Sequence, residues 1–595
     1  MKRLQLATLT MISLALVITG CMSIRDAETQ STDAPPSEII RSNEPDTPAA
    51  PVSEFENRRP FKYTITTAID GEDRRSEVIY GRNGDTVSIL VSINSVDGRF
   101  PVKYDLDCDG DGVYEYIGLT DNQTCTYKRK TGKHQIWLRG NIPGLWLCGR
   151  AEACADENID GDGIKDLNGN YLDFRCYLPK KNDFVEDESG NMHVDDAANA
   201  VLSVDDWGDI EWESMYGFAG FCANLASIPR DAPDLKNVHD MSYMFHFAEK
   251  FNQPVQHWNV SAVTKMNDTF NKASSFNQPL EKWDMSNVTT IRRMFKQASA
   301  FNQSLENWNV SNVKDMYATF SNAEVFNKPL EKWDVSNVTM MSAMFFHAPQ
   351  FNQPLKKWNV SNVADMRVMF ADAVAFNQPL NQWNVSSVEN MSSMFSGAES
   401  FNQPLNQWNV SNVKDMSSMF SNAESFNQPL NQWNVSNVKD MNSMFSNAKS
   451  FNQPLNQWNV SNVTNMGKMF ESAAVFNQPL EKWNVSNVII MEEMFANAKS
   501  FNQPLSKWNI ANVCYMSNMF NQASNFSHYP KSWTVPDGNT DDISVHSSMF
   551  NGTKVENLAK KESLKAVVKK QCNDNTERAY SNYWYRLDYG DHVYY

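Results

Sequence analysis

Aromatic residues recur every 25 positions across the second half of the chain. A phenylalanine recurs from Phe251 to Phe526 and a tryptophan from Trp258 to Trp533, which defines twelve units between residues 251 and 550. The unit at 401–425 reads FNQPLNQWNVSNVKDMSSMFSNAES, and the next unit differs only at Asn442 and Lys449. Self-similarity at a fixed period is typical of repeat arrays, whose units bury their hydrophobic faces against one another.

Each unit has two halves with different patterns. The apolar residues of the second half are Val413, Met416, Met419, Phe420 and Ala423. Their spacing of three and four residues predicts a short helix with one apolar stripe. The first half, FNQPL, contains a proline and predicts a very short strand or an extended turn. The repeating asparagine at its second position, Asn402 in this unit, can form a hydrogen-bonded ladder between units.

We therefore expect an α/β repeat solenoid, similar to a leucine-rich repeat, with one short strand and one short helix in each 25-residue coil. Stacked strands are about 4.8 Å apart, whereas packed helices need about 8–10 Å. Such an array must curve, with the strand side concave. Before it, the alternating runs FKYTITTAI, TVSILVSI and HQIWL predict a small all-β sandwich over 61–147.

The first residues are typical of an export signal, with Lys2 and Arg3 before an apolar run from Leu4 to Val17. The run Ile18-Thr19-Gly20-Cys21 that follows resembles a bacterial lipobox, which implies cleavage before Cys21 and a covalent lipid on that residue. An ordinary secretory signal with an incidental cysteine is the alternative. We expect a signal peptide over 1–21, a disordered tether over 22–60, an acidic insertion over 148–204, a capping coil over 205–250 and a C-terminal cap and tail over 551–595.

The net charge of -17 argues against nucleic acid as a partner, because phosphates require a basic surface. Most of this acidity lies outside the repeats. The sequence contains neither a glycine-rich phosphate loop nor a nucleophile elbow, so we do not expect an enzyme.

Two acidic loops space oxygen ligands at alternate residues with a glycine at the turn, as a calcium loop requires. The candidate ligands are Asn158, Asp160, Asp162 and Asp166 in one loop, and Asp107, Asp109, Asp111 and Glu115 in the other. Both loops fall short of a full EF-hand. Solvated acidic turns are the alternative for each, and Ca²⁺ is the one cofactor, apart from the covalent lipid, that the sequence suggests.

The exported compartment that the signal implies permits disulfides. Cys108 and Cys125 flank the loop that begins at Asp107, and we expect a disulfide between them. One further disulfide is expected among Cys148, Cys154 and Cys176, but the sequence does not show which two are paired. It does not show a partner for Cys572 either. Cys222 and Cys514 occupy repeat positions, where buried thiols are expected.

The repeat core W-x-V-S-N-V-x-x-M-x-x-M-F and the segment VDDWGDIEWESMYGFAGFCANL at 204–225 resemble the BspA-type leucine-rich-repeat surface lipoproteins of bacteria. Departures are small: Thr269 and Thr319 replace the second methionine, Ile291 the first, and Ser304 the proline. The segment YDLDCDGDGVYEY resembles a polycystic-kidney-disease-type sandwich module. The resemblance implies a protein anchored at the bacterial cell surface, in the outer membrane where one exists, that adheres to extracellular proteins or to neighbouring cells.

Two functions remain open at this point. The repeats either present a binding face, or they form an architectural spacer with the binding activity in the sandwich. Pairs of residues that vary between early units suit a binding face, although drift on an exposed turn would look similar. The pairs are Glu281-Lys282, Glu306-Asn307, Glu331-Lys332 and Lys356-Lys357, where later units have Asn-Gln.

Overall fold

The structure is a computed structural model of the 595-residue chain. Two compact units are present, 1–38 and 39–595, and every described residue belongs to the second. The described residues are 53, 55–66, 86–93, 102–121, 123–128, 133–143, 145–147, 185–186, 192–193, 201–537, 548–559 and 565–568.

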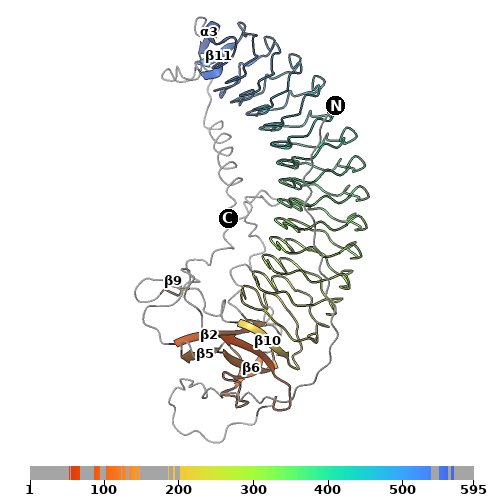
Figure 1. Cartoon of the computed structure of the whole chain (residues 1–595), viewed down its shortest axis with the longest axis vertical. Coiled ribbons are helices and arrows are strands. Elements are labelled where there is room, and N and C mark those ends of the chain that lie inside the picture. The colour runs from red at the N-terminus through yellow and green to blue at the C-terminus, as the bar shows by residue number, and fades with distance from the viewer. Residues whose placement is uncertain are drawn as a thin grey trace, which may run out of the picture. The chain divides into compact units, whose positions relative to one another are not determined.

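Two antiparallel sheets form the part of the chain before the repeats (Figure 1). The larger has the strand order β10-β1-β6-β3-β4 and the smaller the order β5-β2-β7. Their bounds are β1 Phe61–Thr66, β2 Thr86–Ile93, β3 Lys103–Asp107, β4 Tyr116–Leu119, β5 Gln123–Lys128, β6 Lys133–Asn141, β7 Leu145–Trp146 and β10 Val201–Trp207. A separate short hairpin consists of β8 Val185–Glu186 and β9 Met192–His193.

The two sheets share one hydrophobic core. Alternate residues of β1, such as Phe61 and Ile65, are buried in the same cluster as Tyr127 of β5. The disulfide between Cys108, just after β3, and Cys125 of β5 joins the two sheets covalently. This is the sandwich that the alternating runs predict, and the disulfide has the expected partners.

Strand β10 connects the sandwich to the repeats. It pairs with β1, and its Ser203 also forms a parallel bridge with Ser227 in the first coil. The backbone N–H of Leu147 donates to the carbonyl of Phe218 at 2.9 Å, and the ring of Phe61 meets Trp212 edge-on at 5.7 Å. Sandwich and first coil therefore share their core, and the boundary expected at residue 205 falls inside β10.

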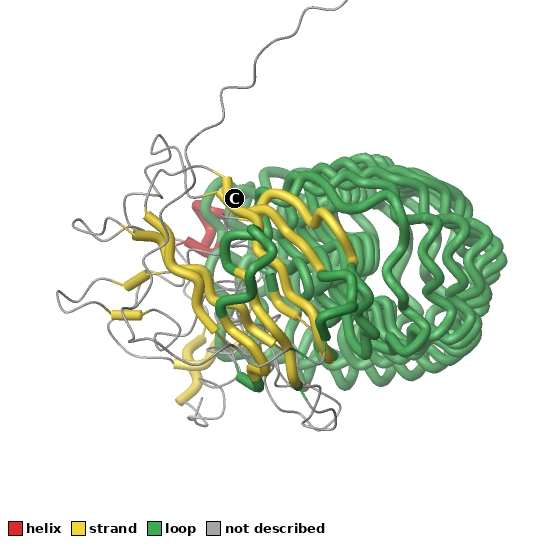
Figure 2. The backbone as a smooth tube through the Cα atoms, turned by 90° about the horizontal axis from the view of Figure 1, so that it is seen from below, coloured by secondary structure: helices red, strands yellow, loops and turns green. Residues whose placement is uncertain are grey.

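The prediction of a helix in each repeat is wrong. All residues from 201 to 537 are described, and none of them is helical. Figure 2 shows the coils of the array as stacked loops and turns. The fold is a solenoid of turns rather than an α/β solenoid, and the short helix α3, Glu556–Ala559, lies beyond the twelve units.

The backbone hydrogen bonds explain why a helix is absent. The N–H groups of alternate residues, Met416, Ser418 and Phe420, donate to carbonyls 24 residues ahead in the next coil, at 3.0, 2.7 and 2.9 Å. The residues between them close turns within the coil, as Met419 does on Met416 at 3.2 Å. An α-helix would instead send every N–H to the carbonyl four residues back.

Left-handed backbone also interrupts each coil twice. Ser418 and Asn422 have φ values of 54° and 55°, and the equivalent residues of the coils from Tyr243 to Gln522 are left-handed as well. A right-handed helix cannot contain such residues. The apolar stripe was misleading because turns that close over three residues also direct Val413, Met416 and Ala423 to one side, where all are buried.

The first half of each unit is extended but forms no strand. Side-chain amides bridge the coils there: the N–H of Asn427 and the Nε2 of Gln428 both donate to Oδ1 of Asn402, at 3.0 and 2.9 Å. The asparagine ladder expected from the sequence is therefore confirmed. The single parallel β-bridge between neighbouring units lies in the second half, as between Asp415 and Asp440.

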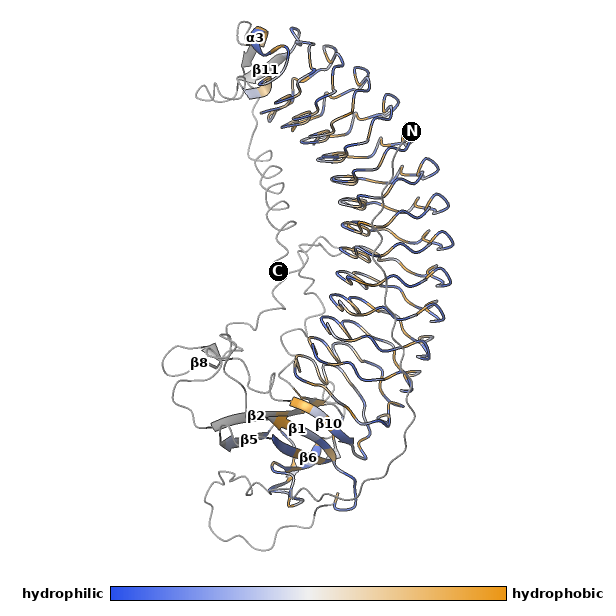
Figure 3. Cartoon of the chain, viewed as in Figure 1, coloured by the Kyte–Doolittle hydropathy of each residue, from blue (hydrophilic) through white to orange (hydrophobic). Residues whose placement is uncertain are grey.

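Ring spacings across one coil show how the array curves. The centroids of Phe395 and Phe420 are 5.7 Å apart, those of Phe401 and Phe426 are 6.0 Å apart, and those of Trp408 and Trp433 are 6.4 Å apart. The coils are thus closest on the hydrogen-bonded side and diverge toward the tryptophans. Even the widest spacing is below the distance that packed helices need. The row of coils is curved (Figure 1), and hydrophobic segments recur at the same place in successive coils (Figure 3).

The array ends in a different structure. The N–H of Phe520 donates to the carbonyl of Met549 at 2.9 Å, and the N–H of Gly552 donates to the Glu556 carboxylate at 2.8 Å. N–H groups at alternate positions of each described coil, such as Met416, Ser418 and Phe420, point toward the C-terminal end, and the Glu556 carboxylate accepts such an N–H where no further coil follows. Beyond it, β11 (Thr534–Asp537) pairs in parallel with β12 (Lys565–Val568).

Candidate binding surface

One surface of the array combines five positions that vary between units. It consists of the fifteenth, seventeenth, eighteenth, twenty-first and twenty-second residues of each unit, on the closely spaced, hydrogen-bonded side of the coils. We call it the ladder face. In unit 401–425 its residues are Asp415, Ser417, Ser418, Ser421 and Asn422.

Packing explains why the other side of the unit is nearly constant. The tryptophan column is buried, and each indole N–H from Trp283 to Trp533 donates to a carbonyl in the preceding coil, as from Trp408 to Leu380 at 3.0 Å. Asn412 similarly donates to the carbonyl of Ser386 at 2.7 Å. On the ladder face the backbone itself joins the coils. The Asp or Asn that recurs at its fifteenth position accepts the N–H of the seventeenth residue, as Asp415 does from Ser417 at 2.9 Å.

Aromatic side chains gather on the ladder face of the first two coils. Tyr216 lies against Tyr243 with ring centroids 5.4 Å apart, and Phe221 stacks on Phe247 at 5.2 Å. His246 is buried between them, with its ring centroid 5.1 Å from that of Phe221. Burial lowers the pKa of His246 to about 3, so the imidazole is neutral at pH 7.

Cations follow directly along the same face. Lys272 Nζ lies 4.0 Å from the centroid of the Phe247 ring. Burial lowers the pKa of Lys272, and the neighbouring Lys296 lowers it further. Arg293 forms a bidentate ion pair with Asp268, with Nε–Oδ1 and Nη2–Oδ2 distances of 3.0 Å, and its Nη2 is 3.4 Å from the Tyr243 hydroxyl.

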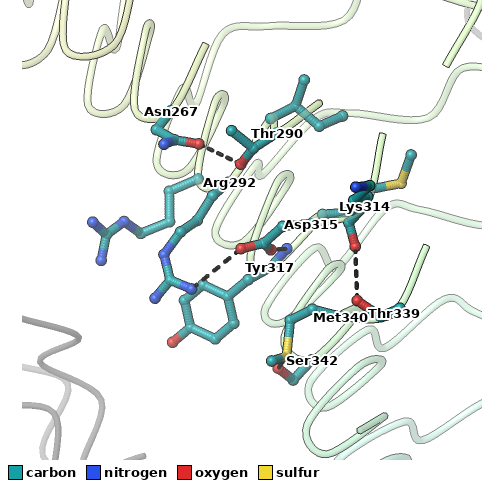
Figure 4. Close-up of polar contacts among 12 residues, drawn as sticks. Asn267, Thr290, Arg292, Lys314, Asp315, Tyr317, Thr339, Met340 and Ser342 are labelled. Carbon is teal, nitrogen blue, oxygen red and sulfur yellow. Dashed lines mark hydrogen bonds and ion pairs between the residues drawn. The ribbon is translucent and has the colours of Figure 1, made fainter. Parts of the chain in front are cut away.

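A second cation network lies beside the first (Figure 4). Arg292 packs over the Tyr317 ring at 4.1 Å and is 3.7 Å from Asp315, whose carboxylate accepts the Tyr317 N–H. Burial lowers the pKa of Arg292 to about 10 and raises the pKa of Asp315. In the same view Thr290 donates to Asn267. These contacts tie side chains of successive coils into one surface.

The ladder face changes character along the array. In units 376–450 its residues are mostly Ser, Asn and Gly, as at Ser393, Gly397 and Asn447. In the units that follow it carries Lys468, Glu471, Glu492, Glu493 and Tyr515. The aromatic and cationic side chains are therefore concentrated at the end nearest the sandwich.

The variable pairs singled out from the sequence lie on a different edge, at the sixth and seventh residues of each unit. Ion pairs join them between neighbouring coils: Lys332 to Glu306 at 3.3 Å, and Lys357 to Glu331 at 3.1 Å. Their variation thus partly reflects pairing between coils. The aromatic residues of the ladder face were missed, although they stand at positions where the central units 376–450 have Ser, Asn or Gly.

The loop after β3 brings carboxylates together. One ligand atom each from Asp107, Asp109 and Glu115 lies within 4.8 Å of the others, whereas Asp111 lies outside this group. Asp107 is buried, and its carboxylate accepts the N–H groups of Asp109, Gly110 and Gly112. Burial raises the pKa of both Asp107 and Glu115.

One oxygen of this loop lacks a hydrogen-bond partner, which favours a bound cation. Glu115 Oε1 is buried without a hydrogen-bond partner, while Oε2 accepts the N–H of Cys108. A cation would satisfy Oε1 and offset the mutual repulsion of the three carboxylates. Asp107, Asp109 and Glu115 thus fit Ca²⁺, which prefers carboxylate oxygens.

Several predicted sites lie outside the described residues: Cys21, the second acidic loop with Asn158, Asp160, Asp162 and Asp166, and the cysteines Cys148, Cys154, Cys176 and Cys572. The expectation for two other cysteines is wrong. Cys222 and Cys514 are disulfide-bonded rather than free thiols. Both stand near an end of the array, where the repeats adjoin other segments.

No helix among the described residues is both long and apolar enough to cross a membrane. A search of curated proteins finds no match to the chain. The repeats match the family described as "Mycoplasma protein of unknown function, DUF285" in four overlapping regions, 213–331, 316–430, 380–478 and 454–562. These regions cover more than half of the 595 residues, so the chain belongs to the DUF285 family of tandem-repeat proteins.

Proposed function

We propose that this chain is a surface-anchored binding protein whose ladder face contacts extracellular macromolecules. The observation that carries the proposal is the concentration of variation on that face. The buried positions repeat almost unchanged, whereas the ladder face changes from aromatic and charged to Ser- and Asn-rich residues within one array. The fold does not require this change, because the backbone of the units from 251 to 525 follows the same turns.

The curvature of the array suits an extended ligand. Because the coils are closest on the ladder-face side, side chains from successive coils form a continuous strip there. A strip of repeated contact points gains affinity with each coil that a ligand spans. The resemblance to BspA-type surface lipoproteins supports the same role. Lipid attached at Cys21 would hold the chain at the cell surface, with the residues before Ser53 as a tether. The end predicted for this tether at residue 60 is too late, because Phe55 is buried and Arg59 bonds to Asp209.

The experiment compares two matched sets of substitutions in the soluble chain. One replaces Phe221, Tyr243, Phe247 and the ladder-face residues of units 251–375 with the equivalent residues of unit 401–425. The other replaces the variable pairs at 281–282, 306–307, 331–332 and 356–357 with the Asn-Gln of the central units. Both sets use residues that the array already accommodates, so both variants should fold.

Binding is measured against a panel of matrix proteins, plasma proteins, polysaccharides and whole cells. We expect the ladder-face variant to lose binding and the edge variant to retain it. Full binding by the ladder-face variant would contradict the proposal. It would favour the alternative, in which the repeats are a spacer and the sandwich binds.

A calcium ion is the second proposal for this chain. Asp107, Asp109 and Glu115 would hold it, and the buried, unpartnered Oε1 of Glu115 is the observation in its favour. When bound, the ion would stabilise the loop between β3 and β4 rather than take part in chemistry.

A further inference from the structure

The first described residues of the chain lie against the larger sheet of the sandwich. We call Ser53 and residues 55–58 the strap. The Ser53 hydroxyl donates to the carboxylate of Asp105 in β3, and Nη1 of Arg58 donates to the carbonyl of Gly140 in β6 at 3.3 Å. Asp105 alternates with core residues of β3, so the strap lies on the face of this sheet that is turned away from the core.

Few apolar contacts hold the strap in place. Phe55 is 4% exposed, but it lies outside the hydrophobic core cluster, and the guanidinium of Arg58 is 5.3 Å from its ring centroid. The strap also contacts a buried charged pair, in which Nε of Arg139 donates to Asp105 at 3.0 Å. Arg139 donates in addition to the Glu56 carbonyl at 3.4 Å. Burial of charged groups costs hydration free energy, and release of the strap would recover part of it.

The residues directly after the strap are fastened to the first coil. The N–H of Asp209 donates to the Arg59 carbonyl, and the Arg59 N–H donates to the Asp209 carboxylate, both at 2.9 Å. The two segments are so close that a Cβ on Gly208 would lie 2.4 Å from the backbone nitrogen of Phe61. Phe61 is fully buried, and its ring meets that of Trp212 edge-on at 5.7 Å. Removal of Phe61 from this position would expose apolar surface to water.

We propose that the strap is a force-sensitive extension of the tether, which comes off the sandwich under tension while Arg59 and Phe61 stay fastened to the first coil. The inference goes beyond ligand binding and rests on the anchor proposed at Cys21, because a ligand held by the repeats would pull against that anchor. Release of the strap uncovers mainly polar and charged groups, which water can bind, whereas release of Phe61 would open an aromatic core. The strap should therefore open first and lengthen the tether by at most about 20 Å.

Single-molecule pulling on the soluble chain tests the order of opening. One handle is attached at the amino end and the other at Val113→Cys, because Val113 is 63% exposed in the loop after β3. The load then passes through the strap into the sandwich. We expect a first step of at most about 20 Å, followed at higher force by the release of β1. A single step that releases the strap and β1 together would overturn the proposal.

Three variants identify the contacts that break in each step. Phe55→Ser removes the one buried ring of the strap and should shorten the lifetime of the closed strap at a fixed force by about tenfold or more. Arg59→Ala should leave the first step unchanged and shorten the second lifetime by no more than about fivefold, because exposed ion pairs contribute little. Val475→Ser, an exposed substitution in the repeats, is the control and should change neither step. An unchanged first step in Phe55→Ser would contradict the proposal.

Amide exchange gives a second measurement without applied force. The N–H groups of Phe55 and Arg58 bond only within the strap, to Ser53 Oγ at 3.0 Å and to the Phe55 carbonyl at 2.9 Å. They should exchange about a hundredfold or more faster than those of β1, and equal protection would overturn the proposal. The lipid is tested separately. If Cys21 carries no lipid, the tension and thus the role of the strap are wrong, whereas a strap that does not open first refutes this inference alone.

Discussion

The tryptophan column allows the energy of one inter-coil hydrogen bond to be measured. Trp408 is 3% exposed and stacks between Trp383 and Trp433, with centroid distances of 6.5 and 6.4 Å. Its indole N–H donates to the carbonyl of Leu380 at 3.0 Å. Trp258 holds the same position in the first unit and is equally buried, but no described residue accepts a hydrogen bond from its Nε1.

Trp408→Phe and Trp258→Phe therefore form a matched pair. Both variants lose the same part of an aromatic side chain. Trp408→Phe also leaves the Leu380 carbonyl without its donor, which costs about 1–3 kcal/mol. Trp258→Phe instead removes a buried donor that has no acceptor. We expect Trp408→Phe to be the more destabilising of the two by about 1–3 kcal/mol.

Local amide exchange is the suitable assay, because long repeat arrays need not unfold in a single two-state transition. The free energy of local opening is compared between each variant and the unmodified chain, in peptides that cover the substituted coil and its neighbours. Equal losses in the two variants, or a larger loss in Trp258→Phe, would refute the argument that this hydrogen bond stabilises the stack.

Three other predictions concern the anchor, the acidic loop and the buried histidine. Cys21→Ala should abolish incorporation of labelled palmitate, and unchanged labelling would remove the lipid anchor. Chelation of Ca²⁺ should lower the melting temperature of the chain and have no effect on Glu115→Gln, whereas identical melts with and without calcium would exclude the site. The pKa of His246 is lowered to about 3 in the folded chain, so below about pH 6.5 the unfolded chain binds a proton that the folded chain does not. The free energy of unfolding should therefore decrease by at most about 1.4 kcal/mol for each pH unit by which the pH is lowered. His246→Ser should flatten this slope in urea titrations between pH 4 and 7, and an unchanged slope would contradict the burial of a neutral imidazole.

The sequence predicts the architecture of this chain correctly where a pattern of residues is compatible with only one arrangement of the backbone. A tryptophan and a phenylalanine every 25 residues can be buried only by stacking identical coils. The repeated Asn402 position likewise predicts an amide ladder. The alternating runs before the repeats predict two sheets, and Cys108 and Cys125 are joined as expected.

The helix could not be excluded from the sequence because its apolar spacing is ambiguous. Residues such as Met416 and Met419 are directed inward both by a helix and by turns that close over three residues. The difference lies in the left-handed residues Ser418 and Asn422, for which neither serine nor asparagine gives a decisive signal. Once the backbone bonds to the next coil instead of to itself, the coils approach more closely than helices can.

The candidate site was predictable only in part. Variation between units was visible in the sequence, but the pairs chosen at the sixth and seventh positions are partly joined by ion pairs. The ladder face can be recognised only when the backbone shows which residues face outward. Phe221 and Phe247 then become neighbours although 26 residues separate them. The carboxylates of Asp107, Asp109 and Glu115 converge as their spacing suggests, whereas Asp111 does not join them.

Hydroxyl-radical footprinting tests the central proposal most directly, because exposed hydrophobic side chains report on separate surfaces of the chain. Phe221 lies on the ladder face, Val113 in the loop after β3, and Val475 outside the ladder face, with exposures of 36%, 63% and 43%. The soluble chain is labelled free and bound to the tightest ligand of the binding panel. We predict protection of Phe221, Tyr243 and Phe247 with no change at Val113 or Val475. Protection of Val113 with an unchanged ladder face would contradict the account and would assign binding to the sandwich.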